Sequence, residues 1–434
     1  MSIDKPLHQL GLAEAARLIA SGALTSEALV TACLGRIEAR EAVLQAWSSI
    51  DPEHALAQAR ACDAGPPRGL LHGVPIGVKD VLDTFDMPTE MGSSIYKGLR
   101  PAWDASCVAM ARAAGAVILG KTVTCEFAGM APGATTNPHD ASRTPGGSSS
   151  GSGAAVADFM VPLAFGTQTG GSVLRPASFC GVIGFKPTFG TYNRAGVKFA
   201  AESLDTIGLI ARELDDLALM NAVLTNSAAI APAFPQTRLR IGVCQTYLWH
   251  KAEPASRAAL ERSVSAARDA GAHVEEFVLP PPFSQLTETR EILNNVERAR
   301  SLAHEWTHHR SQISPALTRS VELGLATSDD QYRAALRLAE WCRLELDTMF
   351  NSVDVLLAPS ANGEAPEGIA YAGDPSFQGL WTLLHVPTIS LPAGKGPHGM
   401  PVGVQMIAPR YGDRKLLDAA HWLIARAGVH GQME

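Results

Sequence analysis

The sequence predicts an α/β fold in which helices cover both faces of a large mixed, mostly parallel sheet. Three observations carry this prediction. Short apolar runs typical of buried strands alternate with segments of helical periodicity. No internal repeat and no linker divides the chain, which indicates one domain over residues 1–434. With 434 residues, 46% of them hydrophobic, the chain can bury a large core.

The first predicted elements are helices. Residues 10–42 show helical periodicity in two pieces, interrupted around the sequence SGALTS (21–26). Thr25 or Ser26 can cap the second helix, because a side-chain oxygen at that position can accept an unpaired backbone N–H. We expect this helical segment, residues 1–60, to pack on the single domain.

Strands and helices alternate from there on. Predicted strands lie at 73–83, at the end of 106–123, at 159–166, at 239–244, at the end of 255–279, at 353–359 and at 401–409. Predicted helices open the segments 106–123 and 255–279, each ended by a glycine, and fill most of 290–350. This order is typical of parallel strands joined by helices.

Composition argues against several classes of function. The net charge is −7 and no long basic run is present, so nucleic-acid binding is not expected. The N-terminus lacks a signal-peptide pattern and no window of 18 residues is uniformly apolar, so neither secretion nor membrane insertion is expected. The seven cysteines show no CxxC spacing and fit the reduced thiols of a cytoplasmic protein. We expect a small-molecule partner and no cofactor, and leave a homodimer open.

Two clusters of glycine and serine point to a reaction site. The run TPGGSSSGSGAAV (144–156) leads into an apolar segment and then into GTQTGGSVLRP (166–176), an order that a flexible linker does not explain. The second cluster can turn sharply, expose Ser172 to a carbonyl, and direct consecutive N–H groups at the oxyanion that forms. These groups belong to Thr169, Gly170, Gly171 and Ser172. A plain strand–helix turn and a phosphate cradle are the alternatives.

A nucleophilic serine needs a base. None of the 13 histidines has a distinctive setting, whereas Lys79 lies inside the apolar run VPIGVKDV. A lysine buried there would have a lowered pKa and could accept a proton. The alternative is an edge strand whose lysine reaches water.

Three motifs in this order resemble the amidase signature family: GVPIGVKDVLD (73–83), PGGSSSGSGAA (145–155) and the segment GTQTGGSVLRPASFCGVIGFKPTFG (166–190). The resemblance spans nearly the whole chain and is closest in appearance to malonamidase-like bacterial amidases. It implies the amidase signature fold, a catalytic Lys79, a bridging Ser148 that follows a cis peptide, and a nucleophilic Ser172. The oxyanion loop of the family falls on Thr169–Ser172.

The resemblance also implies a reaction. Neutral Lys79 would take a proton from Ser148, which takes one from Ser172, and Ser172 would form an acyl-enzyme that water hydrolyses. We therefore expect a metal-free serine hydrolase that cleaves the carbonyl C–N bond of an amide, an anilide or a carbamate (urethane). The glutaminase A subunit of a tRNA-dependent amidotransferase is the alternative. An inactive scaffold is disfavoured because all three positions are intact.

Other residues around the motifs have expected roles. Arg175 would bind a substrate carboxylate or brace its loop. Cys125, Gly129 and Met130 belong to segments expected to line the pocket. Gln168 stands where many family members carry aspartate, which should change how the loop is supported. We expect the other serines of the first cluster to make hydrogen bonds within their loop: Ser149, Ser150 and Ser152. Cys180 is expected to be a buried thiol.

One motif competes with this interpretation. Residues 304–308 (HEWTH) fit HExxH, in which two histidines on one helix face bind zinc and the glutamate acts as base. Glu322 is a candidate third ligand. The alternative is a polar helix face that matches the pattern by chance. A zinc hydrolase that uses this motif is the remote alternative, and we expect no metal.

Overall fold

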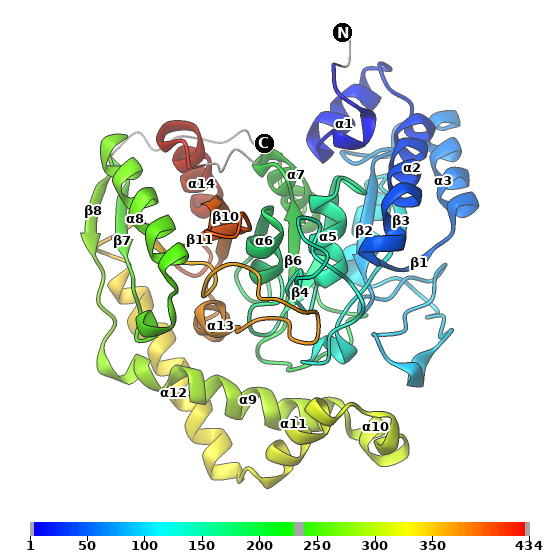
Figure 1. Ribbon diagram of the computed structural model, residues 1–434. Helices are drawn as coiled ribbons and strands as arrows, with labels where there is room; N and C mark the ends of the chain where they lie inside the picture. Colours follow the sequence, from blue (N-terminus) through cyan, green and yellow to red (C-terminus); the bar gives the residue numbers. More distant parts are fainter. Residues whose placement is uncertain (1–3, 230–237, 430–434) are drawn as a thin grey trace.

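The computed structural model describes residues 4–229 and 238–429 and is built around one sheet (Figure 1). Within these ranges the sheet has 11 strands in the order β1-β3-β2-β4-β6-β5-β10-β11-β9-β7-β8. The strands are β1 (Trp47–Ile50), β2 (Pro75–Lys79), β3 (Val117–Thr122), β4 (Leu163–Gln168), β5 (Ile183–Lys186), β6 (Thr206–Ala211), β7 (Arg240–Val243), β8 (His273–Glu276), β9 (Val355–Pro359), β10 (Thr388–Lys395) and β11 (Pro401–Ile407).

The sheet is mixed as predicted, but the expectation of mostly parallel strands is wrong. Among the described strands, six of the ten neighbouring pairs are antiparallel. The reason lies in the centre of the sheet, where no helix separates β5 from β6 and only residues 396–400 join β10 to β11. Strands joined so directly pair antiparallel, whereas helical crossovers produce the parallel pairs toward both edges.

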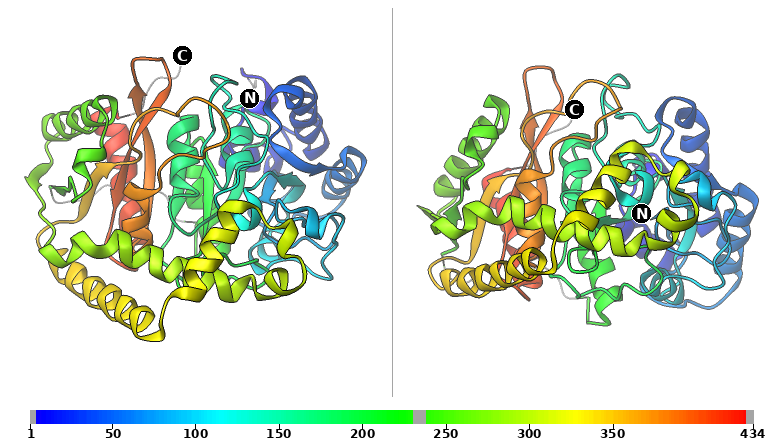
Figure 2. Two further views of the ribbon diagram at one scale, coloured as in Figure 1. Left: turned by 60° about the horizontal axis from the view of Figure 1, so that its bottom comes forward. Right: turned by 90° about the horizontal axis from the view of Figure 1, so that it is seen from below.

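Helices cover both faces of the sheet, as predicted. Helices α5 (Ser150–Ala157) and α6 (Leu174–Cys180) contact its centre from one side, and α7 (Leu214–Thr225) and α14 (Asp413–Ala427) lie on the other (Figure 2). Helix α8 (Pro254–Asp269) covers β9 and β11, and α4 (Ser106–Ala113) packs on α7. None of the described helices is both long and apolar enough to cross a membrane.

The N-terminal segment is helical with one exception. Its helices are α1 (Leu12–Ala20), α2 (Ser26–Leu44) and α3 (Pro52–Ala64). Of the two predicted capping residues, Thr25 caps α2, because its side chain accepts the N–H of Ala28. The segment also contains β1, an edge strand that pairs with β3. The described part of the expected helical segment, residues 1–60, thus contains three α-helices and one edge strand.

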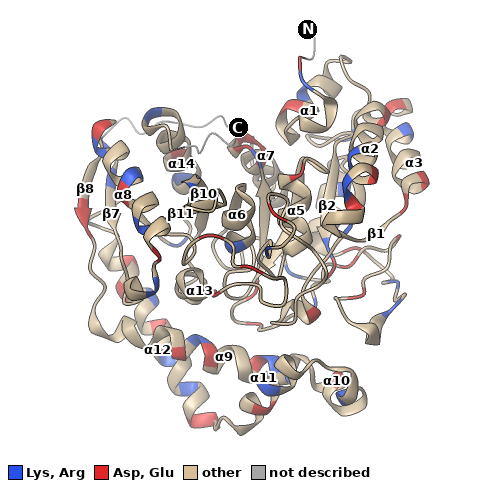
Figure 3. Cartoon of the chain, in the orientation of Figure 1, with Lys and Arg blue, Asp and Glu red and all other residues tan. Residues whose placement is uncertain are grey.

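A group of helices lies across one end of the sheet (Figures 1 and 2). It consists of α9 (Leu286–Ser301), α10 (Ala303–His308), α11 (Pro315–Ala326) and α12 (Asp329–Met349), as the sequence of 290–350 predicts. Helix α13 (Ser376–Leu383) packs against α9. Basic and acidic residues are interspersed along these outer helices (Figure 3).

Candidate active site

The three candidate catalytic residues come from neighbouring elements of the sheet. Lys79 is the last residue of β2, which pairs in parallel with β4. Ser148 lies just before α5, and Ser172 lies between β4 and α6. Parallel strands end at the same edge of a sheet, so this topology brings together loops that are far apart in the sequence.

Lys79 is fully buried and hydrogen-bonded without a carboxylate partner in the described part of the chain. Its Nζ lies 2.7 Å from Ser148 Oγ, 2.8 Å from Thr167 Oγ1 and 3.3 Å from the Thr167 carbonyl oxygen. Burial lowers the pKa of Lys79 to about 7, although the charges of Cys125 and Asp205 oppose the change. A large share of Lys79 is therefore neutral at neutral pH and able to accept a proton from Ser148.

Ser148 is held in place through its backbone. The peptide between Gly147 and Ser148 is cis, as expected. The Gly147 carbonyl accepts a hydrogen bond from Arg175 Nη2 (2.5 Å), and the Ser148 carbonyl accepts one from the N–H of Cys125 (3.2 Å). A Cβ at position 147 would lie 2.9 Å from Cys125 Sγ, so glycine is the residue that fits beside this thiol.

Ser172 is nearly buried, and its hydroxyl is not held by a hydrogen bond in the described part of the chain. It is 8% exposed, and its Oγ makes no hydrogen bond within the described ranges. Its carbonyl accepts the N–H of Ser149 (3.2 Å), which ties the two glycine–serine loops together. Ser149 Oγ in turn donates to the Thr167 carbonyl (3.3 Å), beside Lys79.

The loop from Thr169 to Ser172 presents free N–H groups. Among the described residues, the N–H groups of Gly170, Gly171 and Ser172 have no hydrogen-bond acceptor. Gly171 packs so closely on α13 that a Cβ there would lie 2.4 Å from Gln378 Oε1. Donors fixed in this way can stabilise an oxyanion without reorganising during the reaction.

The side chain of Gln168 holds this loop in place through hydrogen bonds. Its Oε1 accepts the N–H groups of Val173 (2.8 Å) and Leu174 (3.0 Å), and its Nε2 donates to Thr382 Oγ1 (3.0 Å). Thr382 Oγ1 also donates to the Gly170 carbonyl (2.7 Å). An aspartate carboxylate could accept the two N–H groups but could not donate to Thr382, so glutamine gives this loop a different support.

Three buried arginines surround the loop. Arg175 donates from Nη2 to Gly147, while its Nε and Nη1 have no hydrogen-bond partner among the described residues. Arg298 of α9 also has an Nη1 without a hydrogen-bond partner in the described part of the chain, close to Gly129, and a Cβ at Gly170 would lie 3.4 Å from Nη1 of Arg290. Burial lowers the pKa of Arg175 and of Arg298 to about 10, which leaves both charged at neutral pH. Unpaired buried N–H groups are costly and suit an anion.

The remaining predicted pocket residues differ in position. Cys125 is fully buried next to Gly147, and Gly129 lies against Arg298. Met130 is 46% exposed, so it lies farther out than a residue enclosed around the serines. Cys180 is buried, and the hydroxyls of Ser149, Ser150 and Ser152 donate to backbone carbonyls as expected of loop hydrogen bonds.

The HExxH motif does not form a metal site in this structure. Glu305 is fully buried and accepts hydrogen bonds from Tyr96 Oη and Lys198 Nζ, both 2.6 Å. The two histidines of the motif lie on the exposed side of α10. Glu322, the suggested third ligand, pairs with Arg310 (2.9 Å). No group of three ligating side chains exists among the described residues.

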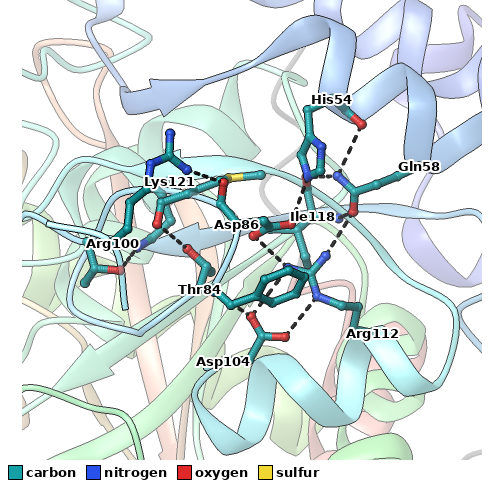
Figure 4. Close-up of polar contacts among 12 residues, drawn as sticks. His54, Gln58, Thr84, Asp86, Arg100, Asp104, Arg112, Ile118 and Lys121 are labelled. Carbon is teal, nitrogen blue, oxygen red and sulfur yellow. Dashed lines mark hydrogen bonds and ion pairs between the residues drawn. The ribbon is translucent and has the colours of Figure 1, made fainter. Parts of the chain in front are cut away.

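A polar network next to β2 was not expected from the sequence (Figure 4). Lys121 of β3 is buried and pairs with Asp80, the residue after Lys79, at 3.1 Å. Its Nζ also donates to Thr89 Oγ1 (2.6 Å), and this hydrogen bond holds the loop that follows β2. Asp86, farther along the same loop, forms separate ion pairs with Arg112 (2.9 Å) and His54 (2.9 Å). Lys121 sits in the apolar run VILGKTV and could have been found by the reasoning that identified Lys79.

Comparison with known proteins places this geometry in context. A family model described as Amidase matches residues 28–417. The A subunit of glutamyl-tRNA(Gln) amidotransferase from Chloroflexus aggregans is 35% identical over 465 residues, covering 95% of each chain. The same subunit from Streptomyces coelicolor is 34% identical over 466 residues, covering 94% of each chain.

Solved structures also resemble this chain along nearly its whole length. A crystal structure of an amidase has a TM-score of 0.88 at 32% identity, covering 96% of this chain and 100% of the other. A chain from a vestigial protein complex, studied for the origins of an s-triazine catabolic enzyme, also has a TM-score of 0.88, at 28% identity, covering 97% and 99%.

Proposed function

The chain belongs to the Amidase family, and we propose that within it Ser172 is the nucleophile, Ser148 the relay and Lys79 the base of a serine hydrolase that acts on carbonyl C–N bonds. The observation that carries the proposal is the buried Lys79, whose pKa of about 7 and 2.7 Å distance to Ser148 Oγ suit a proton acceptor. Arginine or a charged lysine at this position could not take up that proton.

The proposed steps follow from these positions. Lys79 accepts the proton of Ser148 while Ser148 accepts that of Ser172, and Ser172 Oγ bonds to the carbonyl carbon. The N–H groups of Gly170, Gly171 and Ser172 stabilise the oxyanion. The proton returns through Ser148 to the nitrogen, the C–N bond breaks and the amine leaves. Water then attacks the acyl-enzyme by the same relay and releases the acid.

The first candidate for the physiological reaction is release of ammonia from glutamine, as the A subunit of an amidotransferase. The amidotransferase A subunits match nearly the whole chain at 34–35% identity. This similarity favours the first candidate over the malonamidase-like identity expected from the sequence motifs. In this candidate function the protein has other subunits as partners, besides its small-molecule substrate.

The arginines support a substrate that carries a carboxylate. Within the described ranges, two buried nitrogens of Arg175 have no hydrogen-bond partner, and Arg290 and Arg298 add positive charge from α9. Glutamine carries such a carboxylate, and so does an acidic half-amide. We propose that Arg175 binds this group rather than only bracing the loop, since a single hydrogen bond to Gly147 uses one of its donors.

The second candidate is a stand-alone amidase that hydrolyses amides, anilides or carbamates. The likeness to a solved amidase along nearly both chains favours it. In this function the purified chain alone would be fully active.

A substrate panel tests both candidates. Ammonia or amine release is measured with glutamine, an acidic half-amide, a neutral amide, an anilide and a carbamate, with Ser172→Ala as control. Glutamine hydrolysis that rises on adding the other subunits of a related amidotransferase supports the first candidate. Full activity on the other compounds without partners supports the second. Turnover that persists in Ser172→Ala contradicts the proposed nucleophile.

A further inference from the structure

We propose that Asp205 is a positioning residue for the acylation step, in which its carboxylate acts through Thr169 to fix the loop that presents N–H groups to the substrate carbonyl. The inference rests on the proposed function of Ser172. It concerns a residue 33 positions beyond the nucleophile that belongs to none of the sequence motifs.

The register of the sheet brings Asp205 to the loop. Strands β4 and β6 are antiparallel neighbours, and Gln168 pairs with Thr206 at the end of β4. One step further along this ladder, Thr169 lies opposite Asp205. Thr169 Oγ1 donates to Asp205 Oδ1 at 2.5 Å.

Asp205 is itself rigidly held. Its Oδ2 accepts the N–H groups of Ala200 (2.6 Å) and Ala201 (3.3 Å), and its own N–H donates to the Ala201 carbonyl (2.9 Å). The side chain is buried, and no cation within the described ranges forms a salt bridge with it. Burial raises the pKa of Asp205, while its three hydrogen-bond donors and the nearby charge of Arg298 lower it, so these hydrogen bonds must be well formed for the carboxylate to persist.

The contact with Thr169 completes the attachment of the loop. Gln168 holds the far end through Val173 and Leu174, and Thr382 holds the Gly170 carbonyl. Asp205 holds the first residue of the loop. With these three attachments the free N–H groups keep one arrangement, and small displacements of such donors reduce reaction rates strongly.

Asp205 also acts on Lys79 through its charge. The charged or titratable groups around the two residues are Cys125 next to Lys79, Arg298 of α9 beside Asp205, and Arg194, which donates to the Asp205 carbonyl. After Cys125, Asp205 is the second group that raises the pKa of Lys79 against burial. Removal of its charge should therefore lower the pKa of Lys79 and move the acid limb of activity to lower pH.

The experiment compares variants by covalent labelling with a fluorophosphonate, whose addition to a serine also places an oxygen at the oxyanion position. We expect Asp205→Asn and Thr169→Val to lower the maximal labelling rate by about tenfold to a hundredfold with little change in probe affinity. Thr169→Ser keeps the hydroxyl and should label close to the parent rate. The acid limb should move to lower pH in Asp205→Asn and stay in place in Thr169→Val, which retains the carboxylate.

Asp216→Asn is the matched control. Asp216 is another buried carboxylate, and it accepts the N–H of Ala13 far from the serines. This variant should lower the unfolding midpoint and leave labelling and its pH dependence unchanged. Parent-like labelling in Asp205→Asn, or slow labelling with an unmoved acid limb, overturns the proposal.

Two further outcomes distinguish a failure of the Asp205 proposal from a failure of the proposed Ser172 mechanism. If Asp205→Asn does not fold, Thr169→Val and Thr169→Ser decide, because equal rates in both contradict a role for the hydroxyl contact. Labelling that persists in Ser172→Ala contradicts the proposed nucleophile, whereas loss there together with normal rates in Asp205→Asn contradicts only the role of Asp205.

Discussion

Replacement of Lys79 by methionine should make the protein more stable while it removes activity. The reason is the environment that suits catalysis: Lys79 is fully buried, and burial lowers its pKa from 10.5 to about 7. Between these values an unfolded chain binds a proton that the folded chain does not. Stability of the parent should therefore rise with pH across this window.

The size of the effect follows from the two pKa values. At about 1.4 kcal/mol per unit of pKa difference, a fall from 10.5 to about 7 corresponds to a penalty of about 5 kcal/mol well below pH 7. At pH 7 about 4 kcal/mol of it remains, and at pH 10 about 1 kcal/mol. Loss of the hydrogen bonds to Ser148 and Thr167 costs the variant a constant amount that does not depend on pH.

The assay is the free energy of unfolding in urea for parent and Lys79→Met at pH 7 and pH 10. The stability of the variant relative to the parent should fall by about 3 kcal/mol between the two values. Lys186→Met is a matched control, because Lys186 is also fully buried with a pKa of about 7 but, among the described residues, donates only to the backbone carbonyls of Pro187 and Val386. It should show the same trend in stability and keep its activity. A pH-independent difference in Lys79→Met would refute a neutral Lys79.

Four other changes test the site. The rate of hydrolysis should rise from acid to neutral pH with an apparent pKa near 7, because neutral Lys79 is the acceptor, and a flat profile over this range would contradict it. Gly171→Ala should cut kcat by about tenfold or more, since a Cβ would lie 2.4 Å from Gln378 Oε1; Gly35→Ala, which meets open space in α2, should not. Gln168→Glu should destabilise the protein by about 1–3 kcal/mol and slow turnover, because a buried donor is lost, and parent-like unfolding would argue against this support. A chelator should leave hydrolysis intact, and zinc-dependent recovery after its addition would restore the HExxH hypothesis.

The fold was predictable where local patterns decide it. Buried strands such as β2, and helices such as α12, follow from apolar runs and periodicity within a short window. The direction of the central strands does not follow from such local patterns, because it depends on whether the connection between two strands contains a helix. Three central strands, β5, β6 and β10, were not among the predicted strands at all, so the antiparallel pairs that they form were missed with them.

The site was predictable only where a motif marks it. Lys79 and Ser148 come from motifs, and the structure brings their side chains together; their catalytic roles stay predictions. Asp205, Arg290 and Arg298 lie outside any motif, and only sheet register or the packing of α9 brings them near the serines. The HExxH pattern, kept only as a remote alternative, shows the opposite limit, since a local match ignores which face of α10 is buried.

The most direct test of the proposed Ser172 mechanism is the site of covalent labelling. The protein is treated with a fluorophosphonate at pH 8, digested, and mapped by mass spectrometry, alongside Ser172→Ala and Lys79→Met. The account predicts one adduct, on Ser172, absent from the first variant and formed at least about a hundredfold more slowly in the second. An adduct on another residue, or labelling of Ser172→Ala at the parent rate, would contradict it.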